Sequence, residues 1–493
     1  MESQIRQHLR HTWHPFFGRF GRLRPIQKQA IPPIVEGQDI LIGAPTASGK
    51  TEAVCAPLVE RIFRHIEKSR QKRRQQNLRM IVISPTRALC RDLTRRLERP
   101  VTDCGLTIDV KTGDTSPIDY DDPPAVLVTT PESMDSLICR HPKILRDLFS
   151  VVLDELHLLD GTSRGDQLRC TLTRLDQIVD RRMQICGASA TLPNADDLAR
   201  HYLGADGRFI RAGGDSEEEQ EAQRAIEADI TRAPTMEEAA EAVYNVFEHG
   251  GDRKLIVFTN TRAQVEDLTA KLTDYETLRD RVWAHHGSLS RAERFRTEDN
   301  LRDHPAGICV ATMTLEVGID VGDVDRTILL GPPPNVQSLL QRIGRGNRGA
   351  STTRVTCLYD GHFEKIRTLH LLECASDGQL FNERQSFRPS VIAQQALSLT
   401  YQNPKGWISA KALYDRLPQD ARGFWTRADC QKILDKMADG DFFHPMEGDR
   451  FAPDTEAAHQ YEYGQLHSNI ESDQEVEVVD ALTRQVVGRV RFY

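Results

Sequence analysis

APTASGKT, at residues 44–51, has the pattern of a phosphate-binding loop. It follows the strand-like residues 39–42 and opens a helical stretch, so its backbone N–H groups can converge on phosphate oxygens at a helix N-terminus. We expect Lys50 to reach the β- and γ-phosphates of a nucleotide, and Thr51 to bind Mg²⁺. Ala44 replaces the usual first glycine, and Gly-Lys-Thr alone is often only a turn into a helix, so the interpretation requires a second motif.

Two carboxylates, Asp154 and Glu155, supply that second motif. Residues 150–153 before them resemble a buried parallel strand, and ligands of α/β sheets bind where such strands end. Asp154 is placed to hold hydrated Mg²⁺, and Glu155 to orient or deprotonate an attacking water. A solvated acidic loop is the weaker alternative beside the upstream phosphate loop. The two motifs predict ATP hydrolysis with ATP and Mg²⁺ as cofactors.

Length and composition limit the class of protein. A chain of 493 residues should hold two to four domains. The net charge of −8 excludes a globally basic surface but leaves room for a local basic track for nucleic acid. Ten scattered cysteines without a Cys-x-x-Cys pair argue against a zinc ribbon and fit reduced thiols. The polar N-terminus and the lack of a long apolar run predict a cytoplasmic protein with no membrane partner.

Short apolar runs alternate with helical stretches in two groups, which predicts two parallel sheets covered on both faces. The acidic, turn-forming residues 213–219 separate the groups. We therefore expect a first domain at 1–212, an acidic linker at 213–235 and a second domain at 236–385. The expected strands are 39–42, 80–83, 125–128, 151–153 and 183–186 in the first domain, and 255–258, 282–284, 308–310 and 327–330 in the second.

The pattern changes after Gln385 to helices and a hairpin. Residues 391–399, 409–417 and 426–440 read as helices, and 441–443 and 450–451 as strands around a turn. This order predicts a winged helix at 386–455, a module that binds duplex nucleic acid or serves as a packing element. A tail at 456–493 follows, with alternating strands at 475–479 and 485–491. The basic run 68–74 is interpreted as a solvated helix face rather than a phosphate contact.

Two arginines in the second group, Arg345 and Arg348, are spaced to lie near one helical face. We interpret them as arginine fingers that reach across a cleft to the γ-phosphate in the transition state. A nucleotide site divided between two sheets closes when ATP binds and opens after hydrolysis. Such a cycle can do mechanical work.

The motifs from Pro25 to Arg348 resemble, in order, those of superfamily 2 helicases. The resemblance implies two tandem RecA-like parallel-sheet domains followed by the winged helix, within the α/β class. Ser189-Ala190-Thr191 resembles the motif that couples hydrolysis to strand movement. The implied nucleotide contacts are Gln27, Thr46, Ala47, Ser48, Gly49, Lys50, Thr51, Gly318 and Asp320. The implied nucleic-acid contacts are Thr86, Arg87, Gly113, Thr130, Pro131, Asn260, Arg262, Thr312 and Thr314.

Within that superfamily, the chain resembles the Lhr (large helicase-related) group at 44–53, 154–157 and 285–291 and in the winged helix. The resemblance implies 3′-to-5′ tracking on single-stranded DNA and separation of DNA or RNA:DNA duplexes, with repair and phage defence both open. Gly346-Asn347 departs from the Ala-Gly that is common in the group. The group also continues into a further domain where this chain stops at Tyr493, so either this is a minimal form or a partner chain supplies the rest.

Two alternatives remain at this stage. An RNA helicase is the nearest, because no residue pattern identifies a reader of the ribose 2′-hydroxyl. The other is a non-hydrolysing, helicase-like subunit, which predicts the loss of residues such as Lys50, Glu155 or Arg348. All three are present.

Overall fold

The chain divides into two compact units. The first comprises Met1–Thr130, Asp147–His157 and Arg181–Arg384, and the second comprises Pro131–Arg146, Leu158–Asp180 and Gln385–Tyr493. A computed structural model describes residues 2–20, 22–44, 48–68, 77–189, 195–204, 206–211, 225–315, 324–346, 352–376, 387–462, 475–479 and 486–491. In these ranges, no helix combines the length and the apolar character needed to cross a membrane.

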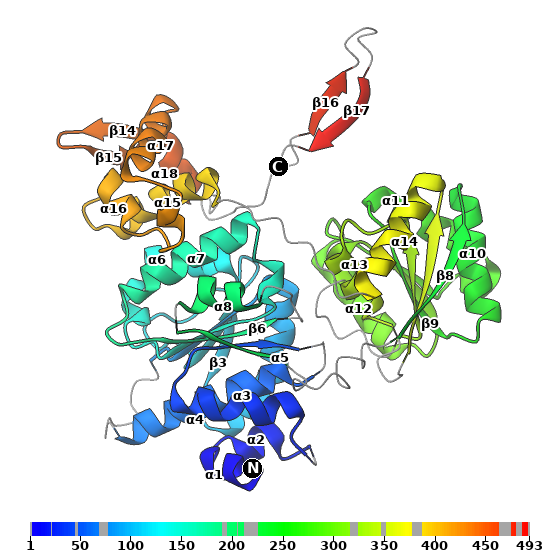
Figure 1. The fold of residues 1–493 in the computed structure, drawn as a ribbon, viewed down its shortest axis with the longest axis horizontal. Coiled ribbons are helices and arrows are strands. Elements are labelled where there is room, and N and C mark those ends of the chain that lie inside the picture. Colours follow the sequence, from blue (N-terminus) through cyan, green and yellow to red (C-terminus); the bar gives the residue numbers. More distant parts are fainter. Residues whose placement is uncertain are drawn as a thin grey trace. The chain divides into compact units, whose positions relative to one another are not determined.

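A parallel sheet in the order β3-β4-β2-β5-β6-β1-β7 lies in the first unit (Figure 1). Its central strands are fully buried and almost entirely apolar, as expected of a sheet covered on both faces. All five predicted strands are confirmed, four with ends within one residue of the prediction, while β6 extends three residues further than predicted. The edge strands β3 and β7 were not predicted, because polar residues interrupt both. The strands are β1 Ile40–Gly43, β2 Met80–Ile83, β3 Ile108–Lys111, β4 Val126–Thr129, β5 Ser150–Leu153, β6 Gln184–Ser189 and β7 Arg208–Arg211.

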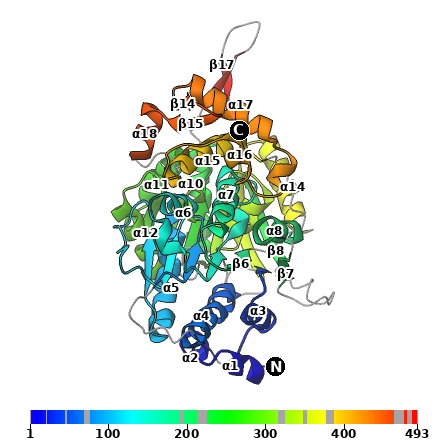
Figure 2. The same ribbon diagram turned by 90° about the vertical axis from the view of Figure 1, so that its left-hand side faces the viewer.

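Helices of the same unit cover this sheet with a continuous apolar core. The first four helices pack in the pairs α1–α3, α3–α4 and α2–α4 (Figure 2). Thr86 caps α5 by accepting a hydrogen bond from Leu89 N. The helices are α1 Glu2–His8, α2 Trp13–Phe17, α3 Pro25–Glu36, α4 Lys50–Lys68, α5 Arg87–Asp103 and α8 Ala195–Leu203, with a 3-10 turn, η2, at Leu156–Leu158.

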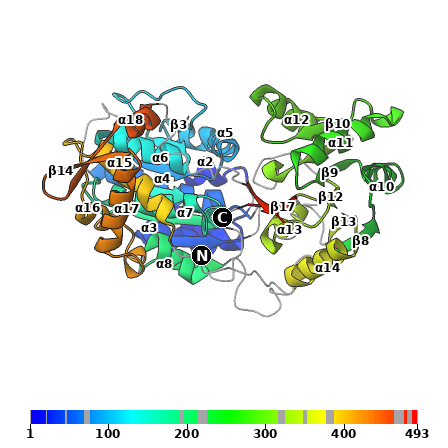
Figure 3. The ribbon, with the colours of Figure 1, turned by 90° about the horizontal axis from the view of Figure 1, so that it is seen from above.

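The second sheet of the first unit has the order β10-β11-β9-β12-β13-β8 and is also parallel. One core joins α10 and α11 to it, and another joins α12, α13 and α14, so helices cover both faces (Figure 3). The strands are β8 Ala225–Arg232, β9 Lys254–Phe258, β10 Val282–His285, β11 Gly307–Ala311, β12 Arg326–Leu330 and β13 Thr352–Tyr359. The helices are α10 Met236–His249, α11 Arg262–Thr273, α12 Arg291–Asp303, α13 Val336–Ile343 and α14 His362–Ser376, with 3-10 turns η3 Glu276–Leu278 and η4 Met313–Leu315.

One boundary needs correction. The predicted linker at 213–235 includes β8, which pairs in parallel with β13 along its whole length. Ile226, Ala228 and Ile230 alternate along β8 and pack against the second core. Because residues 213–219 are acidic, the predicted linker was extended too far toward the C-terminus. Residues 225–232 belong to the second sheet. Residues 212–224 lie outside the described ranges, so the other boundaries stay predictions.

The second unit is mainly helical. It contains α6 Pro131–Arg140, α7 Ser163–Asp176, α15 Pro389–Gln402, α16 Ala410–Tyr414, α17 Arg427–Asp439 and α18 Thr455–Glu462, with 3-10 turns η1 Pro142–Leu145 and η5 Ala421–Gly423. Two antiparallel hairpins complete it, β14 Phe443–Met446 with β15 Arg450–Pro453, and β16 Glu475–Val479 with β17 Val486–Arg491. We call residues 387–462 the C-terminal module.

The predicted helices and both predicted strand pairs of the C-terminal part are confirmed. Ser409 caps α16 and Thr426 caps α17, as their sequence positions indicate. Trp425 packs against the module's core and donates its indole N–H to Phe387 O at 2.9 Å, which fits a core role. The assignment of these elements to a winged helix stays a prediction. Of the basic run, Lys68 ends α4 and the remaining residues lie outside the described ranges.

Candidate nucleotide and nucleic-acid site

The phosphate loop connects β1 to α4, which begins at Lys50. Gly49 has φ +84°, and a Cβ there would lie 2.3 Å from Gln27 Nε2, so this position requires glycine. The buried hydroxyl of Ser48 has no hydrogen-bond partner among the described residues. An unpaired buried hydroxyl beside a helix N-terminus suits the binding of a phosphate oxygen. Thr46 and Ala47 lie outside the described residues.

Lys50 is only 7% exposed and donates to two backbone carbonyls. Its Nζ lies 2.7 Å from Ala44 O and 3.1 Å from Ser189 O, at the ends of β1 and β6. Both acceptors are neutral, so these bonds leave the ammonium charge available for an anion. A triphosphate supplies that charge, and the residues present therefore fit ATP.

The carboxylates at the end of β5 differ in their protonation. Burial and the neighbouring Glu155 raise the pKa of Asp154 to about 7, although Lys50 and Arg96 act in the opposite direction. Burial also acts to raise the pKa of Glu155, but Lys50, His157 and Arg345 outweigh it and lower that pKa. Glu155 is therefore the ionised carboxylate at neutral pH. It also has φ +44°, an unusual backbone conformation at a functional position.

The predicted metal ligands supply oxygen atoms, which Mg²⁺ prefers. Thr51 follows Lys50 on α4, and Asp154 accepts a hydrogen bond from Ser84 Oγ at 3.4 Å. No group of three or more His, Cys, Asp or Glu side chains within the described residues could hold a metal ion. Thr51 and Asp154 would therefore hold Mg²⁺ together with phosphate and water oxygens, and the bound ion would neutralise phosphate charge.

Two further side chains, Arg96 and His157, belong to the nucleotide site. Arg96 Nη2 on α5 lies 3.4 Å from Thr51 Oγ1 and 3.5 Å from Glu52 Oε1. His157 Nδ1 lies 3.5 Å from Glu155 Oε2, and burial lowers the pKa of His157 to about 4, so it is neutral. His157 ends the 154–157 motif, but the motif alone assigned it no role. Arg96 lies 45 residues after Thr51 and belongs to no recognisable sequence pattern, so only the fold reveals its place in the site.

Gln27, the predicted adenine reader, is 4% exposed and lies beside the loop. Its Oε1 accepts from Arg24 N at 2.9 Å, and its Nε2 donates to Gly49 O at 3.2 Å. The side chain is thus held against the phosphate loop. Its contact with adenine stays a prediction.

The predicted arginine finger Arg345 follows α13 and is 5% exposed. Its charge lowers the pKa of Glu155, and Gln341 Nε2 on α13 lies 2.9 Å from His157 Nε2. The structure therefore brings Arg345 into the electrostatic surroundings of the carboxylates. Arg348, Gly318 and Asp320 lie outside the described residues, and their roles stay predictions.

The predicted strand-gripping residues of the first sheet follow β2, β3 and β4, which are neighbours. The carboxyl ends of neighbouring parallel strands share one edge, which collects Thr86, Arg87, Gly113 and Thr130 there. Arg87 pairs with Asp114, and its side chain remains 53% exposed. Pro131 begins α6. Arg87 is the best placed of these residues to meet a phosphate.

The second sheet collects its predicted nucleic-acid residues in the same way, after β9 and β11. Asn260 is not free, since its Nδ2 donates to Pro332 O at 3.0 Å and its Oδ1 accepts from Arg342 Nη1 at 3.1 Å. Arg262 donates to Ser288 Oγ. Arg342, which the sequence analysis did not single out, also lies over the Phe258 ring.

The threonines after β11 form a separate hydrogen-bonded group. Thr314 Oγ1 lies 2.8 Å from His285 Nδ1 and 3.5 Å from Thr312 Oγ1. His285 also approaches Glu298 Oε1 at 3.2 Å through Nε2. The group fixes both hydroxyls at the carboxyl edge of the sheet. Their contact with nucleic acid stays a prediction.

Two families match successive parts of the chain. The DEAD/DEAH box helicase family matches residues 24–198, and the helicase conserved C-terminal domain matches residues 238–350. The matched ranges include β1 to β6 of the first sheet, β9 to β12 of the second sheet and the motifs between Gln27 and Arg348, whereas β7, β8 and β13 lie outside them.

Curated relatives and a solved structure agree with these matches. The ATP-dependent helicase Lhr-Core protein 2 of Thermococcus barophilus is 31% identical over 67% of this chain and 41% of its own length. The Lhr helicase/uracil glycosylase of Escherichia coli is 28% identical over 78% of this chain and 29% of its own length. The chain thus spans less than half of either relative.

The Mycobacterium smegmatis helicase Lhr, solved with single-stranded DNA and AMP-PNP, superposes with a TM-score of 0.75. It is 26% identical, and the match covers 91% of this chain and 60% of that one. With both matched domains present and its motifs in family order, the chain belongs to the DEAD/DEAH box helicase family, and its sequence is similar to those of Lhr helicases.

Proposed function

We propose that this chain is an ATP-dependent helicase or translocase that moves 3′-to-5′ along single-stranded DNA and unwinds DNA or RNA:DNA duplexes. The observation that carries the proposal is the nucleotide site, where Lys50, among the described residues, donates to two neutral carbonyls and its charge helps to keep Glu155 ionised. This arrangement suits phosphoryl transfer to water, which needs charge neutralisation and a positioned nucleophile. Arg345 contributes positive charge from the second sheet.

Support for a nucleic-acid substrate comes from two carboxyl edges that carry predicted contacts and from the relative solved with single-stranded DNA. Contacts of this kind hold mainly phosphates, so binding should tolerate any sequence and weaken steeply with salt. The direction of movement and the use of hybrids follow from the resemblance to the Lhr group. A role in DNA repair or phage defence, in the cytoplasm, goes with this activity.

Two alternatives compete with the proposal. An RNA helicase would use the same two sheets, and none of the described contacts identifies a side chain that would distinguish RNA from DNA by its ribose 2′-hydroxyl. A helicase-like subunit that needs a partner chain would have the same nucleotide site, with low activity until the partner joins. Each alternative predicts a different response to nucleic acid.

The deciding experiment measures ATP hydrolysis by the full chain with no nucleic acid, with single-stranded DNA and with single-stranded RNA of the same sequence. We expect DNA to stimulate hydrolysis, with loss of the signal on addition of EDTA and in Lys50→Ala. Stimulation by RNA alone would replace the proposal with the RNA helicase. Activity that no nucleic acid stimulates, with Lys50→Ala still inactive, would favour the subunit that requires a partner.

A second experiment tests direction and duplex type. Matched duplexes carry a 3′ or a 5′ single-stranded tail, and the tailed loading strand is DNA or RNA. We expect unwinding with a 3′ DNA tail, whether the displaced strand is DNA or RNA. Unwinding only from a 5′ tail would refute the direction, and a requirement for an RNA loading strand would refute the DNA assignment.

A further inference from the structure

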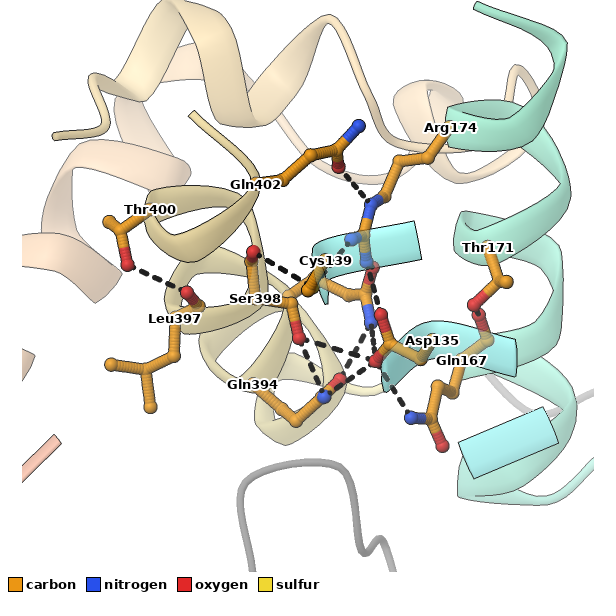
Figure 4. A network of polar contacts seen from close by, with 11 residues as sticks. Asp135, Cys139, Gln167, Thr171, Arg174, Gln394, Leu397, Ser398, Thr400 and Gln402 are labelled. Carbon is orange, nitrogen blue, oxygen red and sulfur yellow. Dashed lines mark hydrogen bonds and ion pairs between the residues drawn. The ribbon is translucent and has the colours of Figure 1, made fainter. Parts of the chain in front are cut away.

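Three helices of the second unit, α6, α7 and α15, share a set of buried polar side chains (Figure 4). We call this set the three-helix network. Asp135 and Arg174 at its centre have side chains that are 0% exposed. The network consists of Asp135 and Cys139 on α6, Gln167 and Arg174 on α7, and Gln394, Gln395, Ser398 and Gln402 on α15.

The carboxylate of Asp135 is surrounded by donors from both other helices. Arg174 Nη1 pairs with its Oδ1, while Oδ2 accepts four further hydrogen bonds. Those four donors are Gln167 Nε2 and Gln394 Nε2 at 2.9 Å each, Gln395 Nε2 at 3.1 Å and Ser398 Oγ at 3.2 Å. Three of the four belong to α15. The buried charge is therefore fully compensated only when α7 and α15 are both in place.

Arg174 extends the same contacts from the other side. Its Nη1 donates to Gln395 Oε1 and its Nε to Gln402 Oε1, each at 2.8 Å. Burial acts to lower the pKa of Arg174, but the neighbouring Asp135 outweighs burial and raises it, so the guanidinium stays charged. A planar guanidinium bonds only partners in its own plane, so α15 has one position in which all of these bonds form.

Adhesion alone does not require such a network. Replacing a buried ion pair by apolar side chains of similar volume is often neutral or stabilising, whereas directional polar contacts select one arrangement. A second polar cluster fixes the other end of the same interface. Arg388, just before α15, donates to Asp166 Oδ2 from its N at 3.1 Å and from its Nη1 at 2.9 Å. Arg169 on α7 pairs with Asp420 of the C-terminal module.

The two clusters lie at different points along α7. Asp166 and Arg174 are eight residues apart, which is about 12 Å along a helix. Contacts at two separated points resist rotation as well as sliding. The C-terminal module is therefore held to α6 and α7 in one orientation.

Both helices follow predicted functional segments along the chain, α6 directly and α7 after seven intervening residues. α6 begins at Pro131, the residue after the predicted strand-gripping Thr130, and α7 follows the carboxylates at 154–155 along the chain. We propose that the three-helix network makes the C-terminal module rigid with α6 and α7, and that Arg174 is thereby a positioning residue for strand separation. Movement of α6 and α7 then carries the C-terminal module with them. This inference rests on the proposed helicase function.

The first test replaces the charged pair by apolar side chains in Asp135→Leu/Arg174→Met, which removes the directional contacts without leaving a buried charge. We expect DNA-stimulated ATP hydrolysis to stay within about twofold, while base pairs unwound per ATP fall roughly ten- to a hundredfold, as a small misplacement can cost about that much. Arg427→Met, on an exposed arginine of the same module, is the matched control. Unchanged unwinding per ATP in a folded double variant would overturn the proposal.

The second test uses a covalent link in place of the Arg169–Asp420 pair. Arg169→Cys/Asp420→Cys is treated with a short bis-maleimide, and the two single variants receive the same treatment. Nine of the ten native cysteines are buried and Cys104 is partly so, so the new pair should react first. We expect weakened unwinding before linking and recovery after it. Linked protein that hydrolyses ATP with DNA but cannot unwind would show that the module must move against α7, and would overturn rigidity.

A third measurement does not depend on activity. Hydrogen exchange of the wild-type full chain should show α7 and α15 opening together, and the double variant should lose protection in α15 more than in α7. If the wild type shows no DNA-stimulated hydrolysis, the proposed function fails, but hydrogen exchange still tests whether the three-helix network holds α15 rigidly to α7. If amide hydrogens of wild-type α15 exchanged much faster than those of α7, the rigid connection between the C-terminal module and α7 would be refuted.

Discussion

Removing the guanidinium of Arg174 should lower the free energy of unfolding, because it breaks the buried Asp135–Arg174 ion pair. Arg174→Met keeps much of the side-chain volume but leaves Asp135 fully buried without its cation, and the amides of Gln395 and Gln402 without this donor. Loss of one partner of a buried ion pair costs about 3–5 kcal/mol. Because Asp135 Oδ2 keeps its four other donors, we expect a loss near the lower end, about 3 kcal/mol.

The assay is urea denaturation followed by the fluorescence of Trp425, which packs in the core of the C-terminal module. A chain with several domains need not unfold in one step, so the signal must come from this module alone. The other tryptophans, Trp13, Trp283 and Trp407, are therefore replaced by phenylalanine in every variant. Arg427→Met again serves as the control, and Asp135→Leu/Arg174→Met should be more stable than Arg174→Met because it contains no unpaired charge.

Two results would refute this reasoning. If Arg174→Met lay within about 0.5 kcal/mol of Arg427→Met, the Asp135–Arg174 pair would be behaving as a surface pair. If the double variant were less stable than the single variant, the four buried donors that lose Asp135 Oδ2, and not the unpaired charge, would dominate the interface.

Four further predictions concern the nucleotide site and one helix cap. Lys50→Ala should lower ATP turnover by about 10²-fold or more, since it removes the cation from the phosphate loop, and a steady-state ATPase assay showing normal turnover would contradict the site. Glu155→Gln should bind ATP, by nucleotide titration, but hydrolyse it poorly, because the amide cannot act as the ionised carboxylate. Arg345→Ala should lower kcat by on the order of 10³-fold and change KM little; a change in KM alone would exclude an arginine finger. Hydrogen bonds from Thr426 and Lys432 lower the pKa of Asp429 to about 2, so its contribution to stability is complete above the unfolded-state value of 3.8 and is lost as pH falls through about 2. Asp429→Asn should flatten that part of the curve of thermal unfolding against pH, and an unchanged curve would exclude Asp429 as its source.

The central strands could be predicted because each is a short, nearly uninterrupted apolar run, as in β2 and β5. The edges could not, because β3 and β7 have one neighbouring strand each and carry charged residues. β8 was hidden for a different reason. Its alternation of apolar and charged residues lies directly after an acidic stretch, and its pairing with β13 joins residues more than a hundred positions apart.

The candidate site likewise contains residues that a short sequence motif identifies and residues that meet only through the fold. Gly49, Lys50, Asp154 and Glu155 lie in short motifs whose chemistry is local, so the sequence alone identified them. Arg96 and Arg342 act through contacts made by the fold, with Thr51 and Asn260 respectively, and neither contact has a fixed spacing in the sequence. Asn260 illustrates the limit most clearly, since a residue predicted to contact nucleic acid also ties together two parts of its own domain.

Among the described residues, the buried polar groups of the phosphate loop have no oppositely charged partner in ion-pair contact, whereas the charged groups of the three-helix network pair with each other. This difference indicates what each region does. In the phosphate loop, Ser48 Oγ has no partner among the described residues, Lys50 bonds only neutral carbonyls, and Asp154 has its pKa raised toward neutrality. A polyanion with its cation would satisfy all three, so the cost of burying these groups is recovered on binding. In the three-helix network, Asp135 already has five donors and Arg174 has acceptors on two other helices. The described polar groups of the network therefore leave no hydrogen bond for a ligand to make. Buried charged side chains suit ligand binding in the phosphate loop and hold helices together in the three-helix network.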